Sequence, residues 1–387
     1  KTMKERILIA MKPSLEEKNQ RHLKTRPRQT KKAIARNAAI LVVSLIFLVA
    51  GVTMVYAESL LGRINTVVDE STGGDNPFQQ TSADPVGEDV SSPEDGEGDT
   101  ADTDISLPDS EGLKKVGGLW HDDMIANILV MGVDDYQPND PGRTDSMMLI
   151  TIDTRHEQLK VTSFMRDMYV AIPGYSSNRI NTAYFLDGPS LLVSTIEANF
   201  GIDIDRWVVV DFSAFNEIID AMGGVEITLT QEEANLINQN SGDPRWNLSA
   251  GTSTLSGAQA RYYARIRAIG DDFERTQRQR NVFAAIVNKF KSSDIGTINN
   301  VLYNTLNLIQ TNMSRNYILS LAGQSLTYLN YDLHELRIPG DGQYQSTYVN
   351  ISGYRSAVLV PDRAACSESL VHFVFGDADE YEASLEE

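Results

Sequence analysis

Aspartate and arginine side chains gather at four places in the sequence, and together they could bind phosphate and a divalent metal ion. The first is segment 132–145, GVDDYQPNDPGRTD, where Asp134 follows an apolar run and Arg143 and Asp145 precede the next. Because a loop between two neighbouring strands brings its ends together, Asp134 and Asp145 are expected to lie close. Two carboxylates suit Mg²⁺, which keeps water and substrate phosphates in its shell. An Asp-rich turn held by its own side chains is the alternative.

Arginines mark the second and third places. Arg166 ends an apolar run, and Asp167 beside it offers a simple ion-pair partner. Arg265 and Arg267, in LSGAQARYYARIR, are two residues apart, a spacing that points both side chains the same way only in an extended segment. A shared site therefore predicts that the preceding helix ends near Ala264. An amphipathic helix with solvated arginines explains the same pattern without a site.

The fourth place is DDFERTQRQR, residues 271–280. Arg275 and Gln279 lie one helical turn apart, with Arg278 adjacent. Ion pairs with the acidic residues at 271–274 are the structural alternative. Taken together, the four places indicate phosphoryl transfer, because guanidinium groups bind phosphate bidentately and this chemistry needs cations around the migrating group.

The elements that would position these residues alternate between strands and helices, which predicts an α/β layered fold with a central sheet. Hydrophobic patterning predicts the following strands: Asn127–Val133, Asp145–Asp153, Lys160–Met165, Trp207–Phe212, Val225–Leu229 and His334–Pro339. It predicts the following helices: Pro189–Phe200, Ser213–Met222, Ser256–Ala264, Phe273–Lys291 and Asn299–Tyr328.

The N-terminal part of the chain is organised differently. Residues 1–36 carry twelve Lys or Arg and form a predicted cytoplasmic tail, followed by the uncharged apolar segment 37–57. This segment is long enough for a transmembrane helix, and its basic flank places the C-terminal bulk outside the cell. A cleaved signal peptide or a buried soluble helix is the alternative.

The remaining chain divides by composition. Residues 69–111 hold fourteen Asp or Glu and no Lys or Arg, so 58–111 is expected to be a disordered acidic linker. A single folded domain is predicted over 112–376, with a frayed acidic tail over 377–387. The net charge of −19 argues against nucleic-acid binding, and the single cysteine, Cys366, excludes a disulfide within the chain.

A series of motifs, in order along the chain, resembles the LytR-CpsA-Psr family. The motifs are GVD…GRTDSMMLITID, SFMRDMYVAIPG, NRINTAYFLDGP, IDIDRWVVVDFSAFNEIIDAMGGVEI, LSGAQARYYARIR and DDFERTQRQRNVFAAI. The resemblance runs from about Asn127 to about Val287. It implies a three-layer α/β/α catalytic domain with a central mixed sheet and a hydrophobic pocket for a polyprenyl tail.

The resemblance also implies an activity and a set of site residues. The activity is transfer of a teichoic acid-like or capsule-like glycopolymer phosphate from undecaprenyl pyrophosphate, a membrane lipid, to a sugar hydroxyl of peptidoglycan. Asp134 and Asp145 would hold Mg²⁺ or Mn²⁺. The pyrophosphate would be bound by Arg143, Arg166, Arg265, Arg267, Arg275, Arg278 and Gln279.

This sequence departs from the family pattern at three positions. Tyr136 stands where many members carry an arginine, Thr144 replaces the usual serine, and Met165 replaces the usual proline. Tyr136 removes one phosphate contact. Two other functions fit the same residues: hydrolysis of a polyprenyl pyrophosphate, with water as the acceptor, and non-catalytic binding of wall glycans by a membrane-tethered regulatory protein.

Overall fold

The computed structural model describes residues 65–66, 107–108, 112–134, 142–241, 243, 245–305 and 308–385. The predicted basic tail, the apolar segment 37–57, almost all of the acidic linker and Tyr136 lie outside these residues. None of the helices in the described part of the chain combines the length and the apolar character that crossing a membrane requires.

A seven-stranded sheet forms the centre of the domain, with strand order β1-β12-β9-β4-β5-β6-β13. β4 pairs antiparallel with β5 and parallel with β9, and β6 pairs parallel with β13, so the sheet is mixed as predicted. Its strands are β1 (Asn65–Thr66), β4 (Ile125–Val133), β5 (Thr144–Asp153), β6 (Gln158–Phe164), β9 (Arg206–Val210), β12 (Ile309–Thr311) and β13 (Asp332–Ile338).

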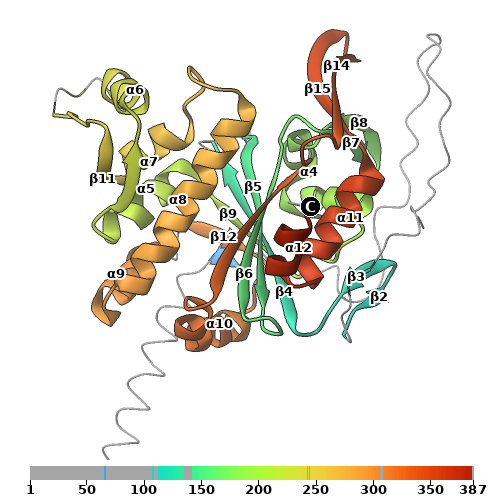
Figure 1. Cartoon of the computed structure of the whole chain (residues 1–387), viewed down its shortest axis with the longest axis horizontal. Helices are drawn as coiled ribbons and strands as arrows, with labels where there is room; N and C mark the ends of the chain where they lie inside the picture. Colours follow the sequence, from blue (N-terminus) through green and yellow to red (C-terminus); the bar gives the residue numbers. More distant parts are fainter. Residues whose placement is uncertain are drawn as a thin grey trace, which may run out of the picture. The chain divides into compact units, whose positions relative to one another are not determined.

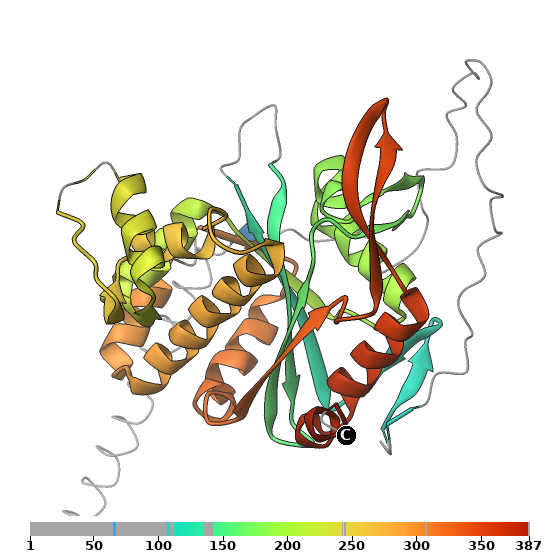
Figure 2. The same cartoon turned by 45° about the horizontal axis from the view of Figure 1, so that its top comes forward.

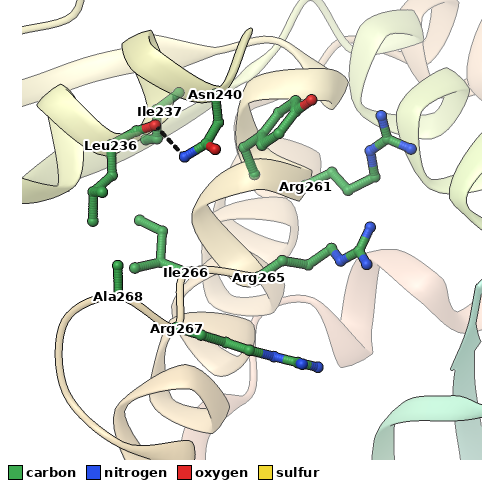
Figure 3. Close-up of a pocket in the computed structure, with 9 residues that line it drawn as sticks. Leu236, Ile237, Asn240, Arg261, Arg265, Ile266, Arg267 and Ala268 are labelled. Atoms are coloured by element: carbon green, nitrogen blue, oxygen red, sulfur yellow. Dashed lines mark hydrogen bonds between the residues drawn. The ribbon is translucent and has the colours of Figure 1, made fainter.

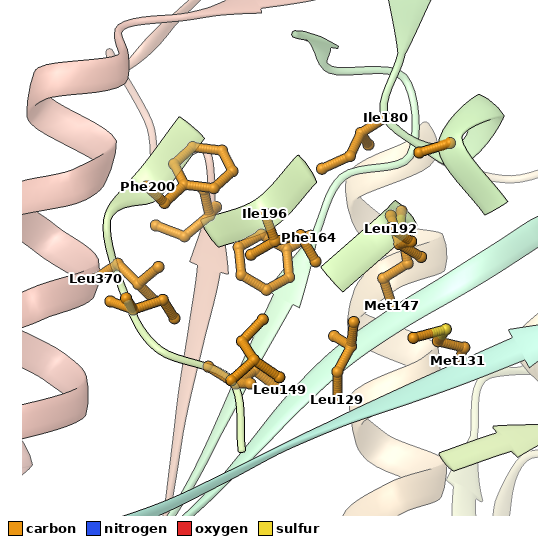
Figure 4. Close-up of a cluster of buried hydrophobic side chains, with 14 of the residues drawn as sticks. Leu129, Met131, Met147, Leu149, Phe164, Ile180, Leu192, Ile196, Phe200 and Leu370 are labelled. Carbon is orange, nitrogen blue, oxygen red and sulfur yellow. The ribbon is translucent and has the colours of Figure 1, made fainter. Parts of the chain in front are cut away.

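Helices cover both faces of this sheet (Figure 1). On one face, α4 (Asn181–Phe200) and α11 (Arg363–Phe375) bury Leu129 and Leu149 with a stacked pair of rings, Phe164 and Phe200 (Figure 4). On the other face, α8 (Asp272–Ser292) and α10 (Arg315–Tyr328) pack on alternate strand residues such as Ile128 and Ile150. Side chains alternate between the faces of a strand, so β4 and β5 supply both cores. The predicted three-layer α/β/α architecture is confirmed.

A second cluster of elements beside the sheet has its own core. It comprises α5 (Phe212–Ala221), β10 (Val225–Leu229), α6 (Gln231–Ser241), β11 (Gly251–Leu255), α7 (Gly257–Ala264) and α9 (Ile295–Thr305). Three further hairpins are β2 (Lys114–Val116) with β3 (Leu119–His121), β7 (Tyr169–Ile172) with β8 (Tyr175–Arg179), and β14 (Tyr344–Ile351) with β15 (Tyr354–Pro361). The last of these projects beyond the sheet (Figure 2).

Three predicted segments differ from the structure. Within the disordered linker expected over 58–111, Asn65–Thr66 instead forms β1, which pairs parallel with β12 in the central sheet. The single helix expected over 299–328 is instead α9, the short strand β12 and α10, because Thr311 pairs with β9 and its hydroxyl donates to the carbonyl of Trp207 at 2.5 Å. The acidic tail expected from Asp377 instead forms α12 (Ala378–Ser384). There, Gln158 donates to Asp377 at 2.9 Å and Ala378 is fully buried, so this end packs on the domain.

Glu197 lies on α4 near the start of β9, at the end of the sheet opposite to Asp134. Its carboxylate accepts a hydrogen bond from the backbone N–H of Ile204 at 3.2 Å. Burial raises the pKa of Glu197 to about 7; the hydrogen bond opposes this, while the charges of Asp203 and Asp205 add to it. Between the ordinary pKa of 4.5 and about 7, the folded protein therefore holds a proton that the unfolded chain lacks, so stability falls as the pH rises.

We expect the free energy of unfolding to fall by about 2 kcal/mol between pH 5 and pH 8 through this group. Glu197→Gln, which mimics the protonated carboxyl, should flatten the dependence and be more stable than the wild type at pH 8. Urea unfolding of both proteins at the two pH values measures the difference. A variant with the same slope as the wild type would show that Glu197 is not the titrating group.

Candidate active site

The β4–β5 hairpin places Asp134 and Asp145 at the same end of the sheet. The register shifts between Gly132 and Val133, so Asp145 is the extra residue of a β-bulge. The backbone N–H of Arg143 donates to Oδ1 of Asp134 at 2.7 Å. Gly142 has φ +77°, and a Cβ there would lie 2.8 Å from that same oxygen, so the close approach requires glycine. The loop therefore brings its two ends together, as the sequence predicts.

Asp145 is the meeting point of residues far apart in the sequence. Arg166, at the end of β6, donates through Nη1 to Oδ1 of Asp145 at 2.6 Å. Arg267 donates through Nη2 to Oδ2 at 3.4 Å, and Gln279 donates to the Asp145 backbone carbonyl at 3.4 Å. Strands β5 and β6, the end of α7 and helix α8 thus converge on one carboxylate.

The first turn of α8 extends this cluster. Arg275 donates through Nη2 to Asp272 at 2.8 Å, and Asp272 also lies 3.5 Å from Nη2 of Arg166. The Arg275 side chain is only 3 % exposed. Its Nε and Nη1 are buried and have no hydrogen-bond partner among the described residues. An unpaired buried charged donor is costly, and a bound anion would satisfy these two nitrogen atoms.

The surroundings shift the pKa values of the two central carboxyl groups, Asp145 and Asp272, in opposite directions. Burial opposes ionisation of Asp145, but the hydrogen bond and charge of Arg166, together with the charges of Arg275 and Arg267, outweigh it and lower the pKa of Asp145. Burial raises the pKa of Asp272, and the charges of Arg275 and Arg166 only partly offset this rise. Asp145 is therefore held as a carboxylate and is a poor proton acceptor while the arginines surround it.

Helix α7 ends just before Arg265 and Arg267, two arginines of the cluster. A capping box between Ser256 and Gln259 starts the helix, and it stops at Ala264, as predicted, so that Arg265 and Arg267 leave its end. The Cζ atom of Arg265 lies 4.4 Å from the ring centroid of Phe212. The ring positions this exposed guanidinium by a cation–π contact.

Two cavities adjoin these arginines. One, of about 240 Å³, lies between the sheet and helices α5, α7 and α8. Its lining is mainly apolar, and Asp145, Arg265 and Gln279 also line it. Representative apolar lining residues are Val130, Met148, Val210, Ile218, Val282 and Phe283. The other cavity, of about 460 Å³, lies against α6 and α7 and is more polar. Arg261 and Arg265 line both cavities, and Figure 3 shows their guanidinium groups pointing the same way.

Two of the predicted phosphate ligands lie differently from the rest. Arg143 is exposed, with its Cζ 5.5 Å from the ring centroid of Phe185. The prediction for Arg278 is wrong: its guanidinium is buried and donates to Glu233 at 2.8 Å and to the carbonyls of Ile266 and Ile269 at 3.3 and 3.2 Å. Arg278 ties α8 to α6 and to the loop after α7, so it is a structural residue.

Sequence reasoning missed three residues of this site. Asp272 bridges Arg166 and Arg275, but next to Asp271 it looks like an ordinary helix-start acid. Arg261 and Phe212 form a second cation–π contact of 5.3 Å at the shared wall of the cavities. The spacing of Arg261 and Arg265, one helical turn apart, was the available signal for Arg261.

Comparison with solved structures agrees on the fold. TagT and TagV of B. subtilis match with TM-scores of 0.52 each, at 22% and 24% identity, covering 70% and 66% of this chain and 97% and 98% of theirs. A structure described as the LytR-CPS2A-psr family protein YwtF (TagT) with bound octaprenyl pyrophosphate lipid matches with a TM-score of 0.50 at 21% identity, covering 70% of this chain and 97% of that one.

Curated relatives match over part of the chain. The regulatory protein MsrR of Staphylococcus aureus is 37% identical over 163 residues, 41% of this chain and 47% of that protein, so the match spans about half of its length. The polyisoprenyl-teichoic acid–peptidoglycan teichoic acid transferase TagU of Bacillus mycoides is 31% identical over 221 residues, 56% of this chain and 69% of that protein. The sequence profile of the LytR_cpsA_psr family matches residues 94–359, and the chain therefore belongs to this family.

Proposed function

We propose that this domain transfers a phosphate-linked glycopolymer from a polyprenyl pyrophosphate to a sugar hydroxyl of peptidoglycan. The observation that carries the proposal is Arg275, a buried guanidinium within an arginine cluster at an apolar cavity, with two nitrogen atoms that have no partner among the residues that the structure describes. A diphosphate satisfies these donors, and a hydrocarbon chain suits the apolar lining. The choice of a teichoic acid-like donor and a peptidoglycan acceptor follows the names of the relatives TagU and TagT.

In the proposed reaction, the apolar cavity and the arginine cluster hold different parts of the donor. The prenyl chain occupies the apolar cavity, and Arg166, Arg265, Arg267 and Arg275 bind the pyrophosphate. The acceptor hydroxyl oxygen forms a bond to the glycan-side phosphorus while the bond from that phosphorus to the bridging oxygen breaks, which releases a prenyl phosphate. The arginines stabilise the negative charge on the migrating and leaving groups. The hydroxyl proton passes to the leaving phosphate or to solvent, since the lowered pKa of Asp145 makes this carboxylate a weak base.

We propose Mg²⁺, or Mn²⁺, as the metal of this site. Asp134 and Asp145 offer hard oxygen donors at one end of the β4–β5 hairpin, and glycine at 142 leaves room for the Asp134 carboxylate, so the donor set fits such an ion. When bound, the metal would neutralise phosphate charge. We also propose that segment 37–57 anchors the chain in the cell membrane and that the domain lies outside the cell.

Removal of divalent metal is expected to lower the transfer rate by at least about a hundredfold, because several kcal/mol of charge stabilisation is lost. Mg²⁺ or Mn²⁺ should restore the rate. Asp134→Asn should raise the Mg²⁺ concentration that gives half-maximal activity, whereas Glu226→Gln, an exposed carboxylate of β10, should not. Transfer that continues unchanged in excess chelator would exclude the metal.

The activity itself is tested by incubating the full chain with a lipid-pyrophosphate glycan, with and without peptidoglycan oligosaccharides. The proposal expects a glycan–phosphate–peptidoglycan product that appears only with the acceptor. Release of prenyl phosphate at the same rate without acceptor would identify a hydrolase instead. Tight lipid binding with no product in either case would identify a non-catalytic binding protein.

A further inference from the structure

The β14–β15 hairpin has two unlike faces. Cross-strand register places Tyr344, Ser346, Tyr348 and Asn350 on one face of β14, opposite Pro361, Leu359, Ala357 and Arg355 of β15. On the other face, Val358 is buried and Val349, Ile351 and Val360 are half-buried. Packing on this face, called here the valine face, is centred on Val358, while Gln345, Thr347 and Tyr354 of the same face are exposed. The face with Ser346, Tyr348, Asn350 and Arg355 is exposed to solvent.

This exposed face, called here the tyrosine face, begins at the arginine cluster. The ring of Tyr344 lies 5.4 Å from that of Phe273, which follows Asp272 directly. On the other strand, the backbone N–H of Leu359 donates to the carbonyl of Asp167 at 2.9 Å, next to Arg166. The base of the hairpin is therefore fixed to two residues that flank the phosphate-binding arginines.

The chemistry of the tyrosine face suits a carbohydrate. Tyr348 is 59 % exposed, although the Cζ of Arg355 lies 4.3 Å from its ring centroid. The cation fixes the ring while leaving much of it open, and an aromatic ring with one polar tip is favoured at binding surfaces. Ser346, Asn350 and Arg355 add donors and acceptors for hydroxyl, amide and carboxylate groups. A purely apolar partner would leave these polar groups unpaired.

The sheet order separates this face from the side that the donor uses. The apolar cavity lies over β9, β4 and β5, with α5, α7 and α8. The hairpin follows β13, at the opposite edge of the sheet beyond β6. Both cartoons agree, with α6 and α7 on one side of the β4–β5 ends and the hairpin on the other (Figures 1 and 2). A prenyl donor in the cavity therefore leaves the hairpin side open for the second substrate.

We infer that the tyrosine face binds the acceptor glycan strand, with the ring of Tyr348 stacked on a sugar and Asn350 and Arg355 bonded to its polar substituents. The inference rests on the proposed function, because it assigns the acceptor of that same site. In this arrangement the hairpin positions the acceptor. The glycan strand is held along β14, and one of its sugar hydroxyls reaches the arginine cluster beside Tyr344.

The test compares two exposed tyrosines of one hairpin. Tyr348 lies on the tyrosine face, whereas Tyr354 is 77 % exposed and its register places it on the other face. With saturating donor and a soluble peptidoglycan oligosaccharide as the varied acceptor, Tyr348→Ala should raise the acceptor KM about tenfold, the loss of roughly one aromatic contact. The donor KM and kcat should stay near the wild-type values. Tyr348→Phe should retain most of the affinity, and Tyr354→Ala should match the wild type.

Calorimetric binding of the same oligosaccharide, without donor, separates this inference from the proposed activity. Tyr348-dependent binding by a protein that transfers nothing would support the glycan site and reject the transfer. Wild-type transfer rates and acceptor affinity in both alanine variants would overturn the inference and leave the activity intact. A rise in the donor KM instead of the acceptor KM would also overturn it, since the face would then hold the donor polymer.

Discussion

Arg275→Lys is expected to lower kcat/KM for transfer by about a thousandfold, the upper range for loss of one preorganised donor at a site of developing charge. The wild-type guanidinium uses Nη2 for Asp272, and its buried Nε and Nη1 have no partner in the described part of the chain. A lysine ammonium keeps the charge but loses the planar fork that binds two phosphate oxygens at once. Steady-state transfer with a lipid-pyrophosphate donor measures the loss.

Arg280→Lys is the matched control for this experiment. Arg280 lies on the same helix, its side chain is 8 % exposed, and it donates to Glu335 at 2.9 Å, outside the cluster around Asp145. Both variants disturb a buried arginine–carboxylate pair, so both are expected to lose stability. Only Arg275→Lys should lose activity per folded molecule. Equal losses in the two variants would mean that Arg275 has a structural role alone.

Lys160→Met is expected to lower the free energy of unfolding by about 4 kcal/mol, the range for removing one partner of a buried ion pair. Lys160 is fully buried in β6, the strand next to the edge strand β13 of the central sheet. Its ammonium donates to Asp153 at 2.6 Å and to the carbonyls of Val374 and Gly376 at 3.2 and 2.6 Å. The substitution leaves a fully buried carboxylate and two carbonyls without this cation. Chemical denaturation of both proteins measures the effect.

Lys114→Met provides the comparison at the surface. Lys114 and Asp123 are 2.5 Å apart, a separation like that of Lys160 and Asp153, but both side chains are exposed. Water and salt screen such a pair, so little change is expected. Adding Asp153→Asn to Lys160→Met should recover part of the lost stability, because the double variant buries no uncompensated charge. A Lys160→Met protein as stable as the wild type would refute the assigned role of this lysine.

Local sequence was sufficient to place most of the elements that carry the site. The strand predicted over Val225–Leu229 has those bounds in the structure, and the helix with Arg265 beyond its end stops at Ala264. The periodicity of apolar residues, the capping residues and the glycines determine where helices and strands begin and end. These signals act over a few residues, so they can be read directly from the sequence. Short strands such as β12 were missed, because they exist only through pairing with a distant partner.

The chemistry of the site was determined by the sequence: arginines and aspartates at the ends of apolar elements indicate phosphate binding, whatever the detailed packing. The role of each individual arginine, however, was decided only by the tertiary structure. Arg275 and Arg278 are three residues apart on one helix. Arg275 has two nitrogen atoms without a partner among the described residues, whereas Arg278 donates to Glu233 and to two carbonyls. The physical reason is that a guanidinium's role depends on the acceptors around it, and those acceptors come from elements far away in the chain.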